Sequence, residues 1–190
     1  MKTVMTSSTK KKTTSKPVAK LPTNPFVYEV LELAAKQRTK AKKIEVLRTY
    51  AHDSIKSVFI WNFDESVISL LPEGDVPYEE VDEQVAYSGS LSENIQKEIG
   101  GGEAATKQDG KGKSSLRREY TKLYHFIKGG NDSLSKTRRE SMFINLLQIL
   151  HPKESEILIL TKDKLLTDKY KITFDNVKEA YPDITWGGRS

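Results

Sequence analysis

Residues 136–151, KTRRESMFINLLQILH, carry the strongest core-forming pattern in the chain. Large apolar side chains recur there at intervals of three and four residues, which places them on one face of an α-helix. They are Met142, Phe143, Leu146, Leu147 and Leu150. We therefore expect this stretch to form the central helix of the core.

The segments next to it are also expected to be helical. PKESEILILTKDKLL starts with Pro152 at the first helical position and has Glu154 and Glu156 in its first turn, where acids suit the helix dipole. The run ILIL alone could be a strand, but these signals favour a helix. In SSLRREYTKLYHFI, one predicted apolar stripe consists of Leu116, Tyr120, Leu123, Tyr124 and Ile127. KGGN should end that helix, with Gly129 or Gly130 in the left-handed conformation.

Five further helices and a C-terminal anchor complete the expected fold. Asn24 is the expected N-cap of the first helix, with Pro25 at its first position and a stripe of Phe26, Val27, Val30, Leu31 and Ala34. Thr39 should start a second helix, with Ala41, Ile44, Leu47 and Ala51 on one face. Asp53 and Asp64 are candidate caps of two more, and Thr173 of the last. Beyond Pro182, Ile184 and Trp186 are expected to fold back as an anchor.

The predicted class is all-α. We expect a compact array of about seven short helices in antiparallel pairs, in one domain over residues 24–190. Residues 1–23 are rich in Lys, Thr and Ser and have almost nothing to bury, so a disordered basic arm is expected. A Gly-rich stretch over about residues 84–113 is expected to be a mobile loop.

The positive charge of the chain is concentrated in the arm. The formal net charge is +5, and residues 1–23 hold six lysines and no acid, so the remainder is nearly neutral. Such an arm attracts polyanions, including nucleic acids; a solubilising leader is the alternative. Within the body, eleven acids lie between Asp64 and Glu103, and nine bases lie between Lys111 and Arg139. These two blocks could neutralise each other.

The basic stretch KQRTKAKK, Lys36 to Lys43, is a second candidate for nucleic-acid binding. Lys40, Lys42 and Lys43 fall in the first turn of the second helix, where the dipole disfavours cations, so a bound phosphate could compensate them. A solvated helix face, or pairing with acids of the same chain, is the favoured alternative. The candidate nucleic-acid-binding residues are Lys10, Lys11, Lys12, Lys36, Arg38, Lys40, Lys42, Lys43, Arg117, Arg118, Lys122, Arg138 and Arg139.

Nothing in the sequence recommends an enzyme. His52, His125 and His151 are not at metal-ligand spacing, and Gly100 to Gly102 lack the context of a phosphate loop. Tyr120 and Tyr124 could stack on bases, but their place on the apolar stripe favours core packing. We expect no catalytic residue, metal, cofactor or small-molecule substrate. There is no cysteine, and no apolar run is long enough for a signal peptide or a membrane span, so a soluble protein that stays in its compartment of synthesis is expected.

Five blocks of the sequence resemble an uncharacterised protein family of large tailed phages, notably those that infect marine bacteria. The blocks are NPFVYEVLELAAKQRTKAKKIEVLR, LLPEGDVPY, SLRREYTKLYHFIKGGN, TRRESMFINLLQILHPKE and ITFDNVKEAYPDITWG. The resemblance implies a protein acting in the cytoplasm of the infected bacterium. We expect a non-enzymatic accessory factor in replication or transcription that binds DNA, RNA or a protein of that machinery. The alternative is a protein-interaction module that redirects a host machine, or a minor assembly factor, without nucleic-acid binding.

Overall fold

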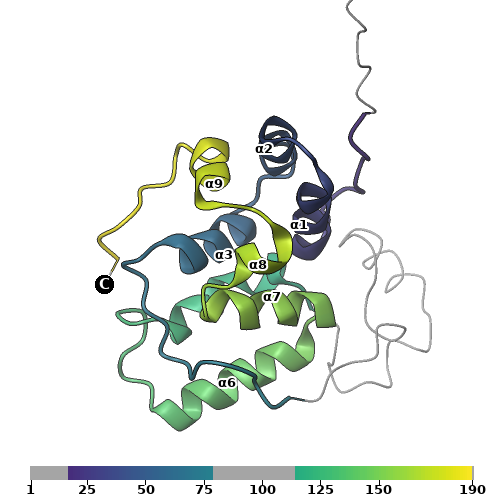
Figure 1. Ribbon diagram of the computed structural model, residues 1–190. Helices are drawn as coiled ribbons and strands as arrows, with labels where there is room; N and C mark the ends of the chain where they lie inside the picture. Colours follow the sequence, from purple (N-terminus) through teal and green to yellow (C-terminus); the bar gives the residue numbers. More distant parts are fainter. Residues whose placement is uncertain (1–16, 79–113, 190) are drawn as a thin grey trace, which may run out of the picture.

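The computed structural model describes residues 17–78 and 114–189, which form eight α-helices and one 3-10 helix (Figure 1). In order they are α1 (Val27–Lys36), α2 (Lys40–Thr49), α3 (Asp53–Phe63), α5 (Leu116–Glu119), the 3-10 helix η2 (Tyr120–Phe126), α6 (Lys136–Ile149), α7 (Pro152–Lys162), α8 (Leu166–Tyr170) and α9 (Phe174–Ala180). The two β-bridges in the described residues are isolated. The predicted all-α class is confirmed.

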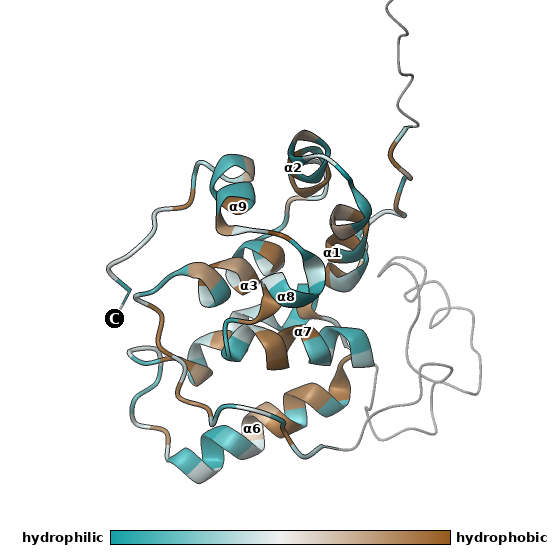
Figure 2. Cartoon of the chain, viewed as in Figure 1, coloured by the Kyte–Doolittle hydropathy of each residue, from teal (hydrophilic) through white to brown (hydrophobic). Residues whose placement is uncertain are grey.

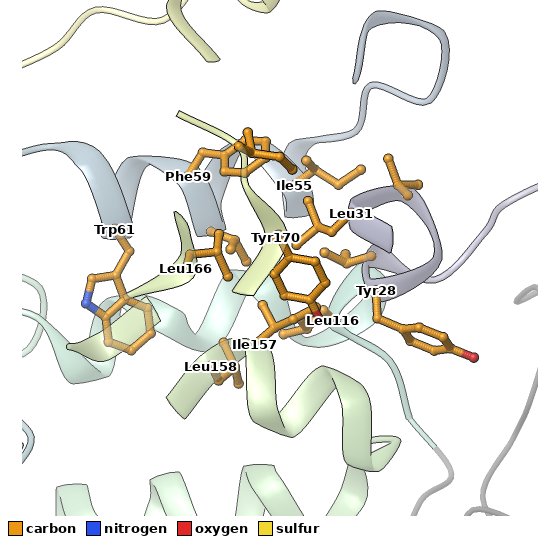
Figure 3. Packing of buried hydrophobic residues seen from close by; sticks show 14 of the residues in the cluster. Tyr28, Leu31, Ile55, Phe59, Trp61, Leu116, Ile157, Leu158, Leu166 and Tyr170 are labelled. Atoms are coloured by element: carbon orange, nitrogen blue, oxygen red, sulfur yellow. The ribbon is translucent and has the colours of Figure 1, made fainter. Parts of the chain in front are cut away.

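Helix α7 lies at the centre of the arrangement and packs against α1, α3, α6 and α8. Helices α2 and α9 pack together at the top of the view in Figure 1, and α6 lies at the bottom. The core joins residues distant in sequence: Figure 3 shows the ring of Tyr170 near Leu31, Leu116 and Ile157, which come from α1, α5 and α7. The two described segments thus share one hydrophobic cluster.

Helix α6 has the predicted apolar face. Phe143, Leu146, Leu147 and Leu150 are buried, and Met142 is half-buried against the same cluster. In Figure 2 the N-terminal end of α6 is hydrophilic and its C-terminal half is hydrophobic. The helix begins after Ser135, whose Oγ accepts from the N–H of Arg138 at 3.3 Å. The central position expected for α6 is, however, occupied by α7. The ILIL run of α7 is helical as predicted, and Pro152 is the first residue of the helix.

Two of the predicted N-caps, Thr39 and Thr173, are confirmed, whereas Asn24 and Asp53 do not cap helices. Thr39 and Thr173 cap α2 and α9 through their hydroxyl groups, as expected. The prediction for Asn24 is wrong: Asn24 has a φ of +53°, and α1 begins at Val27, with Glu29 Oε2 accepting from the N–H of Phe26 at 3.1 Å. Asp53 is already the first residue of α3, because the Nδ1 of His52 caps the helix by accepting from the N–H of Ser54.

The helix predicted after Asp64 is absent. Residues 67–70 are instead extended beside the end of η2, where the N–H of Leu70 donates to the carbonyl of Phe126 at 2.8 Å and the N–H of Lys128 donates to that of Ile68 at 2.9 Å. Long-range pairing of the backbone has replaced local helix formation. The side chain of Asp64 does not cap a following helix; it accepts hydrogen bonds from Ser66, Gly187 and Arg189 instead.

The helix predicted over SSLRREYTKLYHFI changes its period partway. After one α-helical turn, α5, the chain continues as η2, where side chains three residues apart lie above one another. Leu123 and Phe126 therefore become the buried pair, while Tyr124 is 48% exposed. The predicted core position of Tyr124 is wrong for this reason. Gly129 supplies the left-handed residue that follows, with a φ of +83°.

Residues 17–23 were predicted to belong to the disordered arm, but part of this segment contacts the body of the protein. Val18 and Leu21 pack against the core cluster, and the N–H of Leu21 donates to the Tyr50 hydroxyl at 2.9 Å. Residues 17–22 therefore lie against the body rather than belonging to the arm. The remainder of the arm and the predicted loop over residues 84–113 lie outside the described residues. The predicted anchor is confirmed, because Ile184 and Trp186 pack against the cluster.

Candidate functional site

The predicted basic residues of α2 are partly engaged within the molecule. Lys40 pairs with Glu179 of α9 at 2.7 Å, and this raises the pKa of Lys40. Lys43 donates to the carbonyl of Lys171 at 2.6 Å. Lys42 is half-buried. The intramolecular interpretation of KQRTKAKK is therefore supported for Lys40 and Lys43, which hold α2 against the C-terminal helices.

Arg139 is a structural residue. It is buried, and its guanidinium donates to three backbone carbonyls, those of His125 at 2.9 Å, Asn131 at 3.1 Å and Leu134 at 3.0 Å. The first lies near the end of η2, and the other two lie in the turn that joins η2 to α6. Because these bonds use the planar donors of the side chain, Arg139 cannot serve as the predicted phosphate contact without releasing that turn.

Arg117 and Lys122 are also engaged. Arg117 is half-buried and donates from Nε to the carbonyl of Pro25 at 3.1 Å, and burial lowers its pKa. Lys122 pairs with Glu119 at 2.6 Å.

Lys36, Arg38, Arg118 and Arg138 are exposed and form no ion pair with another described residue. They lie on α1, the α1–α2 turn, α5 and α6; Lys10, Lys11 and Lys12 lie outside the described residues.

A cavity of about 280 Å³ without an assigned role lies between α3 and η2. Three aromatic side chains contribute to its wall, Trp61 from α3 and Tyr120 and Tyr124 from η2. The rest of the lining consists of aliphatic side chains, the hydroxyl residues Ser57 and Thr121, and Arg189 from the C-terminal segment. We call this cavity the aromatic pocket. Exposed Tyr124 makes part of its wall accessible to solvent.

The part of the wall formed by Trp61 is held by a chain of hydrogen bonds. Trp61 is buried, and its indole N–H donates to Ser69 Oγ at 2.7 Å, which in turn donates to the carbonyl of Lys162 at 2.7 Å. Lys164 donates to the carbonyls of Trp61 and Asp64 at the end of α3. The geometry of Trp61 is therefore set by α7 and by the segment after α3, and the wall is preorganised.

Arg189 reaches the pocket because the C-terminal segment is fastened to Asp64. The buried Asp64 carboxylate accepts from Arg189 at 2.5 Å, from the N–H of Gly187 at 3.0 Å and from both polar groups of Ser66. Burial opposes ionisation, but these hydrogen bonds together lower the pKa of Asp64 to about 2. Gly187 and Gly188 both have positive φ, which lets the chain turn back here.

A second titratable group is enclosed in the core. Glu154, expected only to complement a helix dipole, is fully buried and accepts from the N–H of Leu116 at 3.1 Å. Burial raises its pKa to about 8, although hydrogen bonds from the N–H groups of Leu116 and Val27 act in the opposite direction. Since Val27 and Leu116 begin α1 and α5, this carboxyl joins the starts of two helices to α7.

The three histidines have structural contacts. His52 and His151 cap α3 and α7 through Nδ1, and Asn131 lies 3.0 Å from Nδ1 of His125. Burial is the main cause that lowers the pKa of His52. Over residues 17–78 and 114–189, no group of three or more His, Cys, Asp or Glu side chains is placed to hold a metal ion. In the same residues no helix has the length and apolar character needed to cross a bilayer.

Sequence reasoning missed the aromatic pocket. Its members lie on elements far apart in the chain, and Tyr124 was assigned to the core by an α-helical period that does not apply to η2. The signal that could have suggested the change is the spacing of Tyr120, Leu123 and Phe126 at intervals of three.

Comparisons with known proteins give a family but no function. The searches of curated proteins and of solved structures found no match. The profile of a protein family, described as a family of unknown function (DUF6433), matches residues 30–100 and 98–168. These matches span more than half of the chain and include every residue named here as lining the aromatic pocket except Arg189. The chain therefore belongs to the DUF6433 family of unknown function.

Proposed function

We propose that this protein is a non-enzymatic protein-interaction module whose aromatic pocket receives an apolar side chain of a partner protein. The observation that carries the proposal is the pocket itself: about 280 Å³, walled by Trp61, Tyr120 and Tyr124, and continuous with solvent at Tyr124. Apolar pockets with preorganised aromatic walls suit the anchoring residues of protein interfaces. Ile68, 44% exposed beside η2, adds apolar surface outside the pocket.

The charged residues support a protein rather than a nucleic acid as the occupant. A nucleobase site of the stacking type needs cations along the path of the phosphates. Arg189, the basic residue in the lining, is already paired with Asp64. Arg117 and Lys122, on the same stretch of chain, are bonded to Pro25 and Glu119.

A peptide selection on the purified protein tests the proposal. Peptides from a random library are selected on the wild type, and their affinities are then measured by fluorescence polarisation. We expect a shared aromatic or large aliphatic residue, and affinity at least tenfold lower for Ser57→Trp, which fills the pocket, and for Tyr124→Ala. Leu165→Ala is the matched control, because Leu165 is 44% exposed but does not line the pocket. Peptides insensitive to both pocket variants would contradict the proposal.

The nucleic-acid hypothesis is kept as a second candidate because six lysines and no acid lie within residues 1–23. Its test is mobility shift of single-stranded DNA and RNA at low salt. Deleting residues 1–16 should then weaken binding and reduce its salt dependence, because each lost phosphate contact removes roughly one unit from the logarithmic slope. Binding that is unchanged by the deletion but lost in Tyr124→Ala would instead make the aromatic pocket a nucleobase site. The setting, the cytoplasm of a phage-infected bacterium, is likewise proposed from the sequence resemblance alone.

A further inference from the structure

A smaller cavity, of about 130 Å³, lies between α6 and the segment that follows Leu70. Its apolar surface comes from Leu71 and Val76 on one side and from Phe143 and Ile144 on the other. Two carboxylate residues, Asp75 and Glu140, are also part of the lining. We call it the acidic pocket. It combines an apolar interior with negative charge, unlike the aromatic pocket.

One wall of the acidic pocket is fixed by a buried lysine. The Nζ of Lys162 donates to the carbonyls of Pro72 at 2.9 Å and Gly74 at 2.7 Å, and it pairs with Asp163 at 2.8 Å. The side chain of Lys162 has no exposed surface. Asp163 also accepts from the N–H of Gly74 at 2.9 Å. The segment is thus pinned to the end of α7, and the pocket exists before any ligand binds.

The carboxylates of the pocket are poorly compensated. The nearest described cation to Glu140 is Lys136, one helical turn earlier, with 3.9 Å between Nζ and Oε1. That Oε1 atom is enclosed and accepts no hydrogen bond within the described residues. Asp75 is exposed and has no ion pair in the same part of the structure. Lys162 is already committed to its own carbonyls and to Asp163.

We propose that the acidic pocket binds a lysine or arginine side chain from an extended segment of a partner protein. The aliphatic stem of such a residue packs against Leu71, Val76 and Phe143, and its cation pairs with Glu140 and Asp75. Charge complementarity carries this choice of occupant: the Glu140 side chain is 35% exposed and Asp75 is exposed, so an entering cation can pair with these carboxylates, whereas an apolar side chain would not. The inference goes beyond the proposed function, because it concerns a second pocket with a different ligand chemistry.

The test uses short capped peptides that differ at one central residue, which is arginine, lysine, norleucine or citrulline. Binding to the full chain is followed by ¹⁵N chemical-shift titration. We expect the arginine and lysine peptides to bind at least tenfold more tightly than the norleucine and citrulline peptides, with shifts confined to residues 71–77 and 140–144. Equal binding of the norleucine peptide would overturn the proposal, since no cation would then be recognised.

Matched variants separate a specific pocket from diffuse attraction. Glu140→Gln should weaken the arginine peptide about tenfold, whereas Glu73→Gln, which removes an exposed acid beside the pocket, should change its affinity less than twofold. Equal losses in the two variants would overturn the proposal. So would a tenfold gain of affinity on deleting residues 1–16, because the occupant would then be the chain's own arm. Tyr124→Ala should leave this binding unchanged, so failure here is distinguishable from failure of the proposed function.

Discussion

Arg189 lies 2.5 Å from Asp64, a residue 125 positions earlier in the chain, and the pair joins the C-terminal segment to the end of α3. Asp64 is almost completely enclosed, while Arg189 retains partial contact with solvent. The carboxylate therefore depends on partners that come from the far end of the sequence. This pair gives the first prediction.

Replacing Asp64 by Asn should destabilise the protein by about 2 kcal/mol at neutral pH, the free energy that corresponds to the lowered pKa. A carboxyl with a lowered folded-state pKa contributes stability that is complete above its unfolded value of 3.8 and is lost as the pH falls towards 2. The difference between wild type and Asp64→Asn in urea unfolding should accordingly shrink over that range. A difference that stays constant down to pH 2 would exclude the ionised pair as its source.

The second prediction concerns Glu154, for which the pH dependence has the opposite sign. Its pKa is raised to about 8, so the folded protein holds this proton more tightly than the unfolded chain does. Stability from this group is complete below 4.5 and decreases as the pH rises towards 8, by at most about 1.4 kcal/mol per pH unit.

Glu154→Gln should remove that decrease, which is measured as the difference in unfolding free energy between the variant and the wild type from pH 5 to 8. Burial lowers the pKa of His52, so its contribution to stability is gained as the pH rises; it is common to both proteins and cancels in the difference. Glu73→Gln, at an exposed position, is the control and should parallel the wild type. A pH-independent difference between the Glu154 variant and the wild type would be inconsistent with a protonated Glu154.

The third prediction separates two adjacent arginines. Arg139→Ala should cost about 2 to 4 kcal/mol, because three carbonyls lose a charged donor. Arg138→Ala should be nearly neutral, since Arg138 is exposed. Thermal melts give the stability, and hydrogen exchange should show faster exchange at residues 129–134 in the Arg139 variant alone. Similar melting temperatures for the two variants would mean that the turn does not depend on Arg139.

The fourth prediction concerns the apolar face of α6. Leu146→Ala should cost about 2 to 5 kcal/mol, because it leaves a cavity beside Leu147 and Phe143. Asn145→Ala, on the exposed side of the same helix, should change stability little. Circular dichroism melts of the two variants provide the comparison, and an unchanged melting temperature for Leu146→Ala would show that this face is not part of the core.

The helices that could be predicted are those with local signals. Helix α6 follows from its apolar stripe, α7 from Pro152 and its early acids, and α9 from the hydroxyl of Thr173. The helix expected after Asp64 failed because the partners of that segment, Phe126 and Arg189, lie far away in sequence. Local propensity gives no information about such competition.

The candidate site was less predictable than the fold, for a physical reason. The sequence alone does not distinguish a basic side chain that faces solvent from one that donates to carbonyls in the interior. Arg139 and Lys162 are both buried, and the turns that supply their acceptors are brought together only by tertiary packing. Exposure of Tyr124 likewise depends on the change to a 3-10 helix, which no single residue marks.

The position of Trp61 gives the aromatic pocket an intrinsic optical reporter. The sequence contains two tryptophans, and the second, Trp186, packs edge-on against Phe174 of α9 and does not line the pocket. In a Trp186→Phe background, all indole emission would come from the pocket wall. Quenching or a spectral shift on adding a peptide would then report occupancy directly, without a label on either molecule.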